Sequence, residues 1–241
     1  MLEGNGLLAL WNGVDPARAA EYHLWHTREH VPERVSVPGM IRAFRYVDGD
    51  GPLPSCLTLY DLQAMDVLTS APYRALLENP TEWSRSMRPS FRGFLRLACR
   101  PVARGGGGTG GAVLATTLGL GKGLDLPDPA GFLRGALSIP AVTGAHLAET
   151  DPGVPSVPFT IGGDLPDYPP DYPQDAVLVL EGYSRRALEA ARNAVEAWLA
   201  ASPLAGADTA WTSYALGYAV AAADLPHVVV APRQAPGQAS A

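Results

Sequence analysis

The sequence predicts an α+β fold in which two consecutive β-α-β-β-α-β units pack their antiparallel sheets against each other. Two observations lead to this prediction. The segment Ser36–Phe44 recurs loosely as Ser138–His146, an internal repeat with an offset of 102 residues. In both halves a short apolar strand is followed by an Asp-Pro pair that begins a helix, at Asp15-Pro16 and at Asp128-Pro129. Because one ferredoxin-like unit leaves one face of its sheet bare, we expect the two sheets to form a closed or nearly closed barrel.

The first half, residues 1–104, contains the elements of one unit in order. Short apolar runs bounded by turn residues predict its strands, and the Asp-Pro start predicts its first helix. Pro72 and Pro80 interrupt the second helical region, so two or more short helices are expected there. The predicted elements are a strand at Gly6–Trp11, a helix after Asp15, strands at 41–47 and Ser55–Leu62, the helical region Gln63–Met87 and a strand at Phe91–Arg100.

The second half repeats this plan after a glycine-rich segment, residues 105–111, which predicts a flexible linker. Residues 112–222 form the second predicted unit. Its elements are a strand at Ala112–Leu118, a helix at 130–137, a strand after Ser138, a strand at Asp175–Gly182, a helix capped by Ser184 and a strand at Thr212–Val220. Two segments fall outside the plan. Residues 151–174 hold seven prolines and are interpreted as a lid or a spacer, and residues 223–241 as a tail.

The composition excludes several classes of protein. With 47% apolar and 17% charged residues the chain is expected to be globular, and its net charge of −6 offers no basic face for a nucleic acid. No apolar run reaches the ~18 residues of a membrane helix, and the first residues lack the pattern of a signal peptide. A cytoplasmic location is therefore expected. Cys56 and Cys99 fall on non-neighbouring strands of the predicted sheet, so no disulfide is expected.

The densest group of reactive side chains is the segment Tyr22–His30 on the first predicted helix. It holds His23, His26 and His30, and a histidine with a pKa near neutrality is a common general acid or base. Helical spacing places these histidines at one edge of a buried stripe formed by Ala17, Ala20, Leu24 and Val31. The alternative is an exposed polar helix edge. The equivalent helix at 130–137 has no histidine, carboxylate or tryptophan, which favours a site in the first unit and a supporting role for the second.

A metal site is a further alternative, because His26–His30 matches the pattern H-x-x-E-H. Such a site needs a third ligand, which the sequence does not identify, and Pro32 and Pro38 are expected to end the helix soon after the motif. Glu29 is instead expected to tune a neighbouring histidine. A haem has no attachment motif in this sequence. We therefore expect neither a metal nor another cofactor.

The second predicted strand alternates Arg42, Phe44 and Tyr46 with Ile41, Ala43, Arg45 and Val47. Whichever face of the strand looks at the helix therefore carries an arginine. An arginine or tyrosine there would hold a carboxylate, phenolate or enolate of a substrate. The alternative is an edge-strand arginine that opposes aggregation.

Trp25, His30, Pro32 and Arg34, followed by Val37-Pro38-Gly39 and Arg45-Tyr46, resemble a motif of the dimeric α+β barrel proteins in their EthD-like branch. The resemblance covers the first half at motif level and the second half by plan. It implies two ferredoxin-like units that make a barrel within one chain, with a small-molecule pocket between sheet and helices. Dimerisation of the chain is then optional. The superfamily includes cofactor-free monooxygenases, isomerases, cyclases, dehydratases and chlorite dismutases.

These observations favour a small-molecule enzyme that performs cofactor-free acid/base chemistry. Its reaction is expected to be an isomerisation, dehydration or cyclisation of a carbonyl, lactone or phenolic substrate. The alternatives are a cofactor-independent monooxygenase of phenolic or anthrone compounds and a non-catalytic binding or assembly module. The predicted acid/base residues are His30 and His26, and the predicted substrate-binding residues are Trp25, His23, Arg42, Arg45 and Tyr46.

Overall fold

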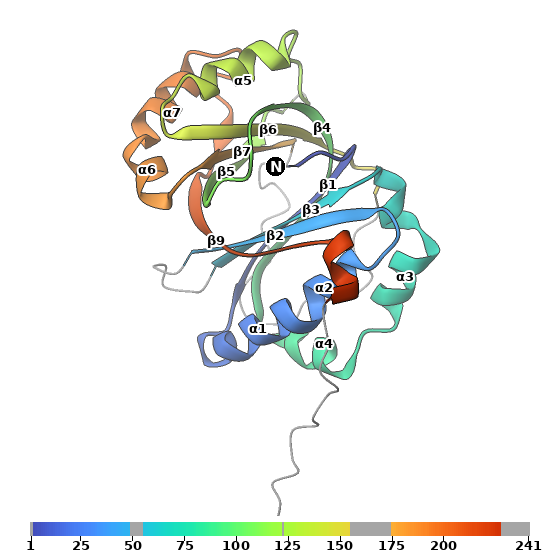
Figure 1. Cartoon of the computed structure of the whole chain (residues 1–241). Coiled ribbons are helices and arrows are strands. Elements are labelled where there is room, and N and C mark those ends of the chain that lie inside the picture. The colour runs from blue at the N-terminus through green and yellow to red at the C-terminus, as the bar shows by residue number, and fades with distance from the viewer. Residues whose placement is uncertain (1, 49–54, 122, 155–174, 228–241) are drawn as a thin grey trace, which may run out of the picture.

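The computed structural model describes residues 2–48, 55–121, 123–154 and 175–227 (Figure 1). Most of the predicted Pro-rich segment 151–174, and most of the predicted tail 223–241, lie outside the described residues. The described residues contain the strands and helices of two units in the predicted order.

The first unit comprises β1 (Gly6–Val14), α1 (Ala19–Trp25), a π-helical turn η2 (His26–His30), α2 (Val31–Val35), β2 (Met40–Asp48), β3 (Ser55–Leu62), α3 (Ala71–Glu78), α4 (Glu82–Met87) and β4 (Phe91–Gly106). The second comprises β5 (Ala112–Gly119), α5 (Pro129–Leu137), β6 (Val142–Thr150), β7 (Ala176–Gly182), α6 (Arg185–Ala190), α7 (Arg192–Ala200), β8 (Asp208–Thr209) and β9 (Thr212–Ala221). Short 3-10 turns at Pro16–Arg18, Met65–Thr69, Arg88–Ser90 and Ala222–His227 complete the described elements.

Eight strands close into one antiparallel barrel, which confirms the predicted fold class. The first unit has the strand order β4-β1-β3-β2 and the second has β9-β5-β7-β6. The second strand of each unit pairs with the last strand of the other, through β2–β9 and β4–β6. Each sheet thereby loses its edges to the other unit, so the barrel needs no second chain to close.

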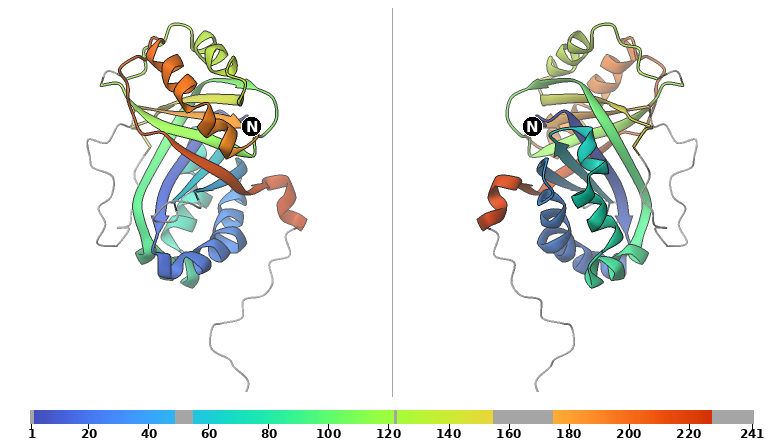
Figure 2. Two further views of the ribbon diagram at one scale, coloured as in Figure 1. Left: turned by 90° about the vertical axis from the view of Figure 1, so that its left-hand side faces the viewer. Right: turned by 90° about the vertical axis from the view of Figure 1, so that its right-hand side faces the viewer.

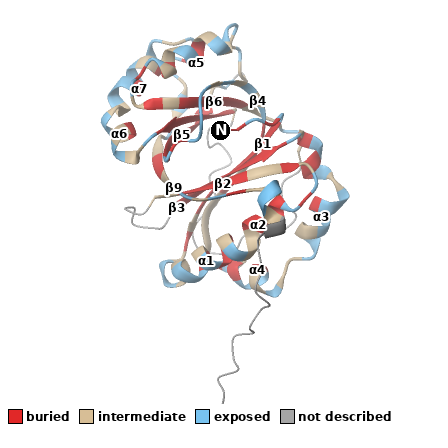
Figure 3. Ribbon diagram, viewed as in Figure 1, coloured by how far each residue is buried: buried red, intermediate tan, exposed pale blue. Residues whose placement is uncertain are grey.

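Side chains fill the barrel, and helices cover it from outside. The helices of the first unit lie on one side and those of the second unit on the opposite side (Figures 1 and 2). Buried residues follow the strands between these helical layers (Figure 3). The lumen core comprises Leu7, Ala9, Trp11, Phe44, Tyr46, Leu57, Leu59, Leu95, Leu97, Val113, Ala115, Ala148, Val177, Val179 and Tyr214, among others.

Strand β4 runs further than the sequence predicted. It extends to Gly106 and pairs with β6 down to Gly106 opposite Gly144, so residues 105 and 106 belong to a strand and not to a flexible linker. Gly106 has a φ of 99°, and a Cβ placed there would lie 2.2 Å from the carbonyl oxygen of Thr143. Only glycine fits at this position.

Two further expectations concern the cysteines and the absence of a membrane-spanning helix. Cys56 and Cys99 are free and buried, on β3 and β4, which are separated by β1 in the sheet. Among the described residues, the helices are too short and too polar for any of them to cross a membrane.

Candidate functional site

The histidine-rich segment contains a change of helix type that the sequence did not predict. Asp15 caps the preceding 3-10 turn by accepting a hydrogen bond from the N–H of Ala17. At the end of η2 the N–H of Val31 donates to the carbonyl oxygen of His26, five residues back. Pro32 has no N–H to offer to residue 28, and the wider π-helical turn accommodates it inside the helix. Pro32 therefore does not end the helix as predicted, since α2 continues to Val35.

The helix face that covers the sheet also differs from the prediction. Ala17 and Ala20 are exposed, and Leu24 is 50% exposed, whereas Tyr22, Trp25 and His26 are buried. The large aromatic side chains bury more apolar area than the alanines and decide which face turns inward. In addition, a π-helical turn shifts the phase of the residues that follow it, so a constant helical angle does not hold through residues 26–30.

His26 and His30 therefore lie inside an aromatic cluster and not at the edge of one. The ring centroid of His26 is 5.3 Å from that of His30 and 5.2 Å from that of Tyr22. The indole of Trp25 lies 4.4 Å from the ring of His30 and donates from Nε1 to Ser84 Oγ at 3.3 Å. His26 is 4% exposed, while His30 is partly exposed. His30 is thus the histidine of this pair that solvent reaches more readily.

Both histidines are held in the neutral form. Burial lowers the pKa of His26 well below 6.5, and positive charge on His30, Arg45 and His23 would lower it further. Burial and the neighbouring Arg34 and Arg88 likewise lower the pKa of His30. A neutral imidazole at pH 7 can accept a proton. The Nδ1 atoms of both rings are buried and, among the described residues, meet no hydrogen-bond partner.

Arg45 is the arginine that the second strand turns toward the helix. Its guanidinium Nη2 donates to His23 Nδ1 and lies 3.5 Å from Cys56 Sγ, and its Cζ lies 5.4 Å from the ring centroid of Tyr22. Because an arginine only donates, His23 accepts through Nδ1. Burial and the charge of Arg45 lower the pKa of His23. Asn12 fixes Tyr22 in turn, through a 3.0 Å hydrogen bond from Nδ2 to the tyrosine hydroxyl.

Sequence reasoning missed two polar side chains beside Arg45. Thr58 lies directly opposite Arg45 on β3, and Tyr60 lies two residues further along the same face. Thr58 is 1% exposed and Tyr60 is 2% exposed, and neither hydroxyl has a hydrogen-bond partner among the described residues. The alternation of residues along β3 was the available signal, because Leu57 and Leu59 point into the lumen and Thr58 and Tyr60 therefore point to the other face of the sheet.

Partly exposed residues also lie on the face of the sheet that the helices cover. Leu10 lies on β1, between β3 and β4, with its side chain on the face covered by helices, yet it is partly exposed. Its neighbours across the sheet are Thr58 on β3 and Arg96 on β4, and Arg96 is also partly exposed. The partly exposed edge of His30, on the helix above, belongs to the same layer.

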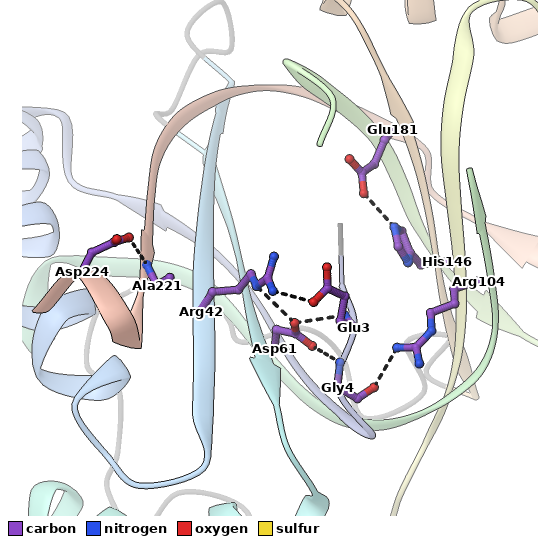
Figure 4. A network of polar contacts seen from close by, with 9 residues as sticks. All are labelled: Glu3, Gly4, Arg42, Asp61, Arg104, His146, Glu181, Ala221 and Asp224. Atoms are coloured by element: carbon purple, nitrogen blue, oxygen red, sulfur yellow. Dashed lines mark hydrogen bonds and ion pairs between the residues drawn. The ribbon is translucent and has the colours of Figure 1, made fainter. Parts of the chain in front are cut away.

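Arg42 and Tyr46 do not belong to this cluster. Strand alternation turns both into the barrel, on the opposite face of the sheet from Arg45. Arg42 pairs with Glu3 at 2.7 Å and with Asp61 at 3.5 Å (Figure 4). Tyr46 packs beside Phe44 in the lumen core. The structure therefore does not bring Arg42 and Tyr46 together with the histidines, whereas it groups Trp25, His23 and Arg45 with His26 and His30.

Glu29 does not face the histidines either. Its carboxylate accepts hydrogen bonds from Thr81 Oγ1 and, at 3.4 Å, from Ser84 Oγ at the start of α4. It thus joins the first helix to α4 instead of tuning an imidazole. Among the described residues, no three His, Cys, Asp or Glu side chains are grouped closely enough to hold a metal ion.

The lumen holds a second polar group, formed by two residues of the second unit. His146 Nε2 and Glu181 Oε1 are 2.7 Å apart, and both side chains are buried (Figure 4). A cavity of about 10 Å³ adjoins His146, and one of about 50 Å³ lies beside Trp11 and Thr117. These volumes suit water molecules and not an organic substrate.

Comparison with known proteins supports the fold and leaves the family open. No protein-family model matches the chain, and no curated protein sequence matches it. Among solved structures, an anthrone oxidase-like protein is similar with a TM-score of 0.58 and 11% identity, over 91% of this chain and 94% of that one. Chlorite dismutase from Candidatus Nitrospira defluvii, in complex with imidazole, gives 0.54 and 13% over 94% of both chains. A protein named as a monooxygenase, from Fusobacterium nucleatum subsp. nucleatum, gives 0.51 and 6% over 90% of this chain and 95% of that one. The chain thus has the dimeric α+β barrel fold, built from one polypeptide.

Proposed function

We propose that this protein is a small-molecule enzyme whose active site lies between η2 and the helix-facing side of β2 and β3. The observation that carries the proposal is the pair His26 and His30, two neutral imidazoles 5.3 Å apart, with the charge of Arg45 acting on His26 and those of Arg34 and Arg88 on His30. A neutral base and a fixed cation in a largely apolar setting are the two components that proton abstraction next to a carbonyl requires. The finer assignment to the EthD-like branch is part of this proposal.

The leading reaction is cofactor-free acid/base chemistry on a carbonyl, lactone or phenolic compound. His30, the more accessible histidine, takes a proton from carbon or oxygen of the substrate. The electron pair left behind moves onto the carbonyl oxygen as an enolate, which the positive charge of Arg45 stabilises. Return of the proton to another carbon gives an isomerisation, and departure of a β-hydroxyl with a proton gives a dehydration. His26, behind His30, sets the basicity of the pair, and Trp25 forms an apolar wall.

A second candidate, cofactor-independent oxygenation, begins with the same deprotonation. It is favoured by the names of two structural neighbours, an anthrone oxidase-like protein and a monooxygenase. An anthrone-type CH₂ group would react as its carbanion with O₂, giving C=O and one molecule of water, so that atoms and electrons balance. The two candidates differ in whether O₂ is consumed. A non-catalytic binding module is the remaining alternative.

The test measures proton abstraction directly. The protein is incubated in D₂O with a panel of conjugated ketones, lactones and anthrone, and loss of the activated C–H signal is followed by NMR while an electrode records O₂. We expect exchange or turnover with at least one compound, and a decrease of about 10²-fold or more in His30→Ala. His146→Ala is the matched control, because it removes a buried histidine from the lumen. Equal rates in wild type, His30→Ala and His26→Ala would refute the histidine base. O₂ uptake would select the second candidate.

A further inference from the structure

The helix-facing side of β2 and β3 carries three buried polar groups that the proposed base does not use. They are Arg45 Nε, Thr58 Oγ1 and Tyr60 OH, and none has a hydrogen-bond partner among the described residues. Their side chains are 3%, 1% and 2% exposed. A buried polar group without a partner is costly, so each such group in a native structure requires an explanation.

The three groups belong to one patch of the sheet. Arg45 and Thr58 are direct cross-strand partners, and Tyr60 follows Thr58 on the same face. Cross-strand partners on one face have Cβ atoms roughly 5 Å apart, and the next residue on that face lies ~7 Å along the strand. The patch borders Leu10, where solvent reaches the sheet, because Leu10 is the partner of Thr58 on β1.

The second unit shows that the fold does not require these polar groups. The register gives the equivalents of Arg45, Thr58 and Tyr60 as Leu147, Leu178 and Leu180, which are fully buried and part of an apolar core. In the first unit Arg42 on β2 pairs with Asp61 on β3, and in the second unit Gly144 on β6 pairs with Glu181 on β7. Counting along the strands from these two pairs gives the equivalent positions. The same three backbone positions are therefore packed with leucines on one side of the barrel and with unpaired hydrogen-bond donors on the other.

The chemistry of the patch selects an anionic oxygen. Arg45 Nε can only donate, and the Thr58 and Tyr60 hydroxyls are free to donate to an acceptor. Burial raises the pKa of Tyr60, while the charges of Arg34 and Arg45 act against this shift. The hydroxyl therefore keeps its proton at neutral pH. Glu33 is an acidic group near Tyr60, and its carboxylate lies 3.6 Å from the guanidinium of Arg34.

We propose that Arg45, Thr58 and Tyr60 form an oxyanion-binding site for the phenolate or enolate oxygen of a planar, conjugated substrate. The inference rests on the proposed function and names the substrate class of that site. The planar class follows from the chemistry, because a phenolate or an enolate is stabilised by conjugation, and Leu10 beside Thr58 supplies apolar surface. Preorganised donors of this kind bind the anion more tightly than the neutral carbonyl or phenol.

The experiment uses 4-nitrophenol as the probe, since its phenolate absorbs visible light and its neutral form does not. Titration of the full-length protein with the probe at several pH values gives the affinity for each form. We expect the wild type to bind the phenolate more tightly than the neutral phenol by about tenfold or more. Tyr60→Phe and Thr58→Val are each expected to weaken phenolate binding about tenfold and to leave binding of the neutral form within about twofold.

Matched controls use the same changes in the lumen. Tyr46→Phe removes a buried tyrosine hydroxyl on the opposite face of the sheet, and Thr117→Val removes a buried threonine hydroxyl of the second unit. Both are expected to bind the phenolate like wild type. Equal phenolate affinity in Tyr60→Phe, Thr58→Val and wild type would overturn the inference, as would equal affinity of wild type for both forms of the probe.

His30→Ala separates this inference from the proposed function. If the oxyanion site is right, His30→Ala keeps the preference for the phenolate within about threefold even where it abolishes deuterium exchange. If exchange is unaffected by His30→Ala but the Tyr60→Phe effect on phenolate binding persists, the base is wrong and the oxyanion site stands. A normal exchange rate in Tyr60→Phe with unchanged phenolate affinity overturns the oxyanion site and leaves the base.

Discussion

Removal of Glu181 tests how much the buried ionic group in the lumen contributes to stability. Its carboxylate is 3% exposed and accepts two hydrogen bonds of 2.7 Å, from His146 Nε2 and from the N–H of Gly110. Glu181→Ala leaves both donors buried without their acceptor. A buried donor left without its acceptor costs about 1–3 kcal/mol, so the two donors together cost about 2–6 kcal/mol. This loss is large beside a typical total stability of about 5–15 kcal/mol.

The assay is urea unfolding at pH 7, followed in parallel by circular dichroism and tryptophan fluorescence. We expect Glu181→Ala to lower the free energy of unfolding by about 2–6 kcal/mol. The exposed Glu78 on α3 gives the control, because Glu78→Ala removes the same charge from the surface and is expected to change stability by less than about 0.5 kcal/mol. A loss below about 1 kcal/mol in Glu181→Ala would refute the reasoning.

The contribution of Glu181 to the free energy of unfolding should depend on pH in a definite direction. Burial alone would raise the pKa of Glu181, but hydrogen bonds from His146 and from the N–H of Gly110 more than offset it, so the pKa lies below 4.5. A carboxylate with a depressed pKa stabilises the folded state fully above its unfolded pKa and loses this contribution as the pH falls. The stability difference between wild type and Glu181→Gln should therefore be constant near pH 7 and shrink progressively below about pH 4.5. A difference that grows on acidification would contradict this account.

Three further changes test the site and the fold. Arg34→Met removes one of the charges that lower the pKa of His30, so histidine NMR should show this pKa rising toward 6.5, whereas Arg104→Met in the lumen should leave it unchanged. Gly106→Ala should lower the free energy of unfolding in urea by about 2 kcal/mol or more, because φ is 99° and the new Cβ meets the Thr143 carbonyl. In the control Gly107→Ala the new Cβ meets nothing within 4 Å, so the free energy of unfolding should not change. Leu24→Ala should change stability by less than about 0.5 kcal/mol, because Leu24 is half exposed. Val31→Ala should cost about 1.5–3 kcal/mol, because Val31 is fully buried, and a loss of similar size in Leu24→Ala would favour the predicted helix face.

The fold was predictable because its signals are local and occur twice. An Asp-Pro helix start and the repeated segment at Ser36 and Ser138 each depend on a few neighbouring residues, and strand alternation needs no tertiary information. The barrel follows from the two bare sheet faces. The extension of β4 to Gly106 was not predictable in this way, because a glycine-rich run has no side-chain pattern and its pairing partner lies about 40 residues further along the chain.

The candidate site was predictable only in part. The sequence identified the histidine segment and one inward arginine, but it could not choose between Arg42 and Arg45, since alternation leaves the two faces of β2 equivalent until the helices are placed. It misjudged the helix face because the large side chains of Tyr22 and Trp25 turn inward in place of Ala17, Ala20 and Leu24, since they bury more apolar area. Thr58 and Tyr60 were passed over because a threonine and a tyrosine in a strand are ordinary residues. Only the unpaired hydroxyls distinguish them.

The two units share one buried carboxylate that binds a glycine N–H, and they differ in the polar side chains of the helix-facing sheet. Asp61 on β3 accepts the N–H of Gly4 at 2.7 Å, and Glu181 on β7 accepts the N–H of Gly110 at the same distance. Each glycine lies two residues before the first strand of its unit, and a Cβ on either would collide with a backbone carbonyl. A device present in both units serves the closure of the barrel. The polar patch and the histidines occur in the first unit alone, at positions where the second unit has leucines and a helix without histidine. Since both units fold on the same plan, the fold does not require the polar set of the first unit.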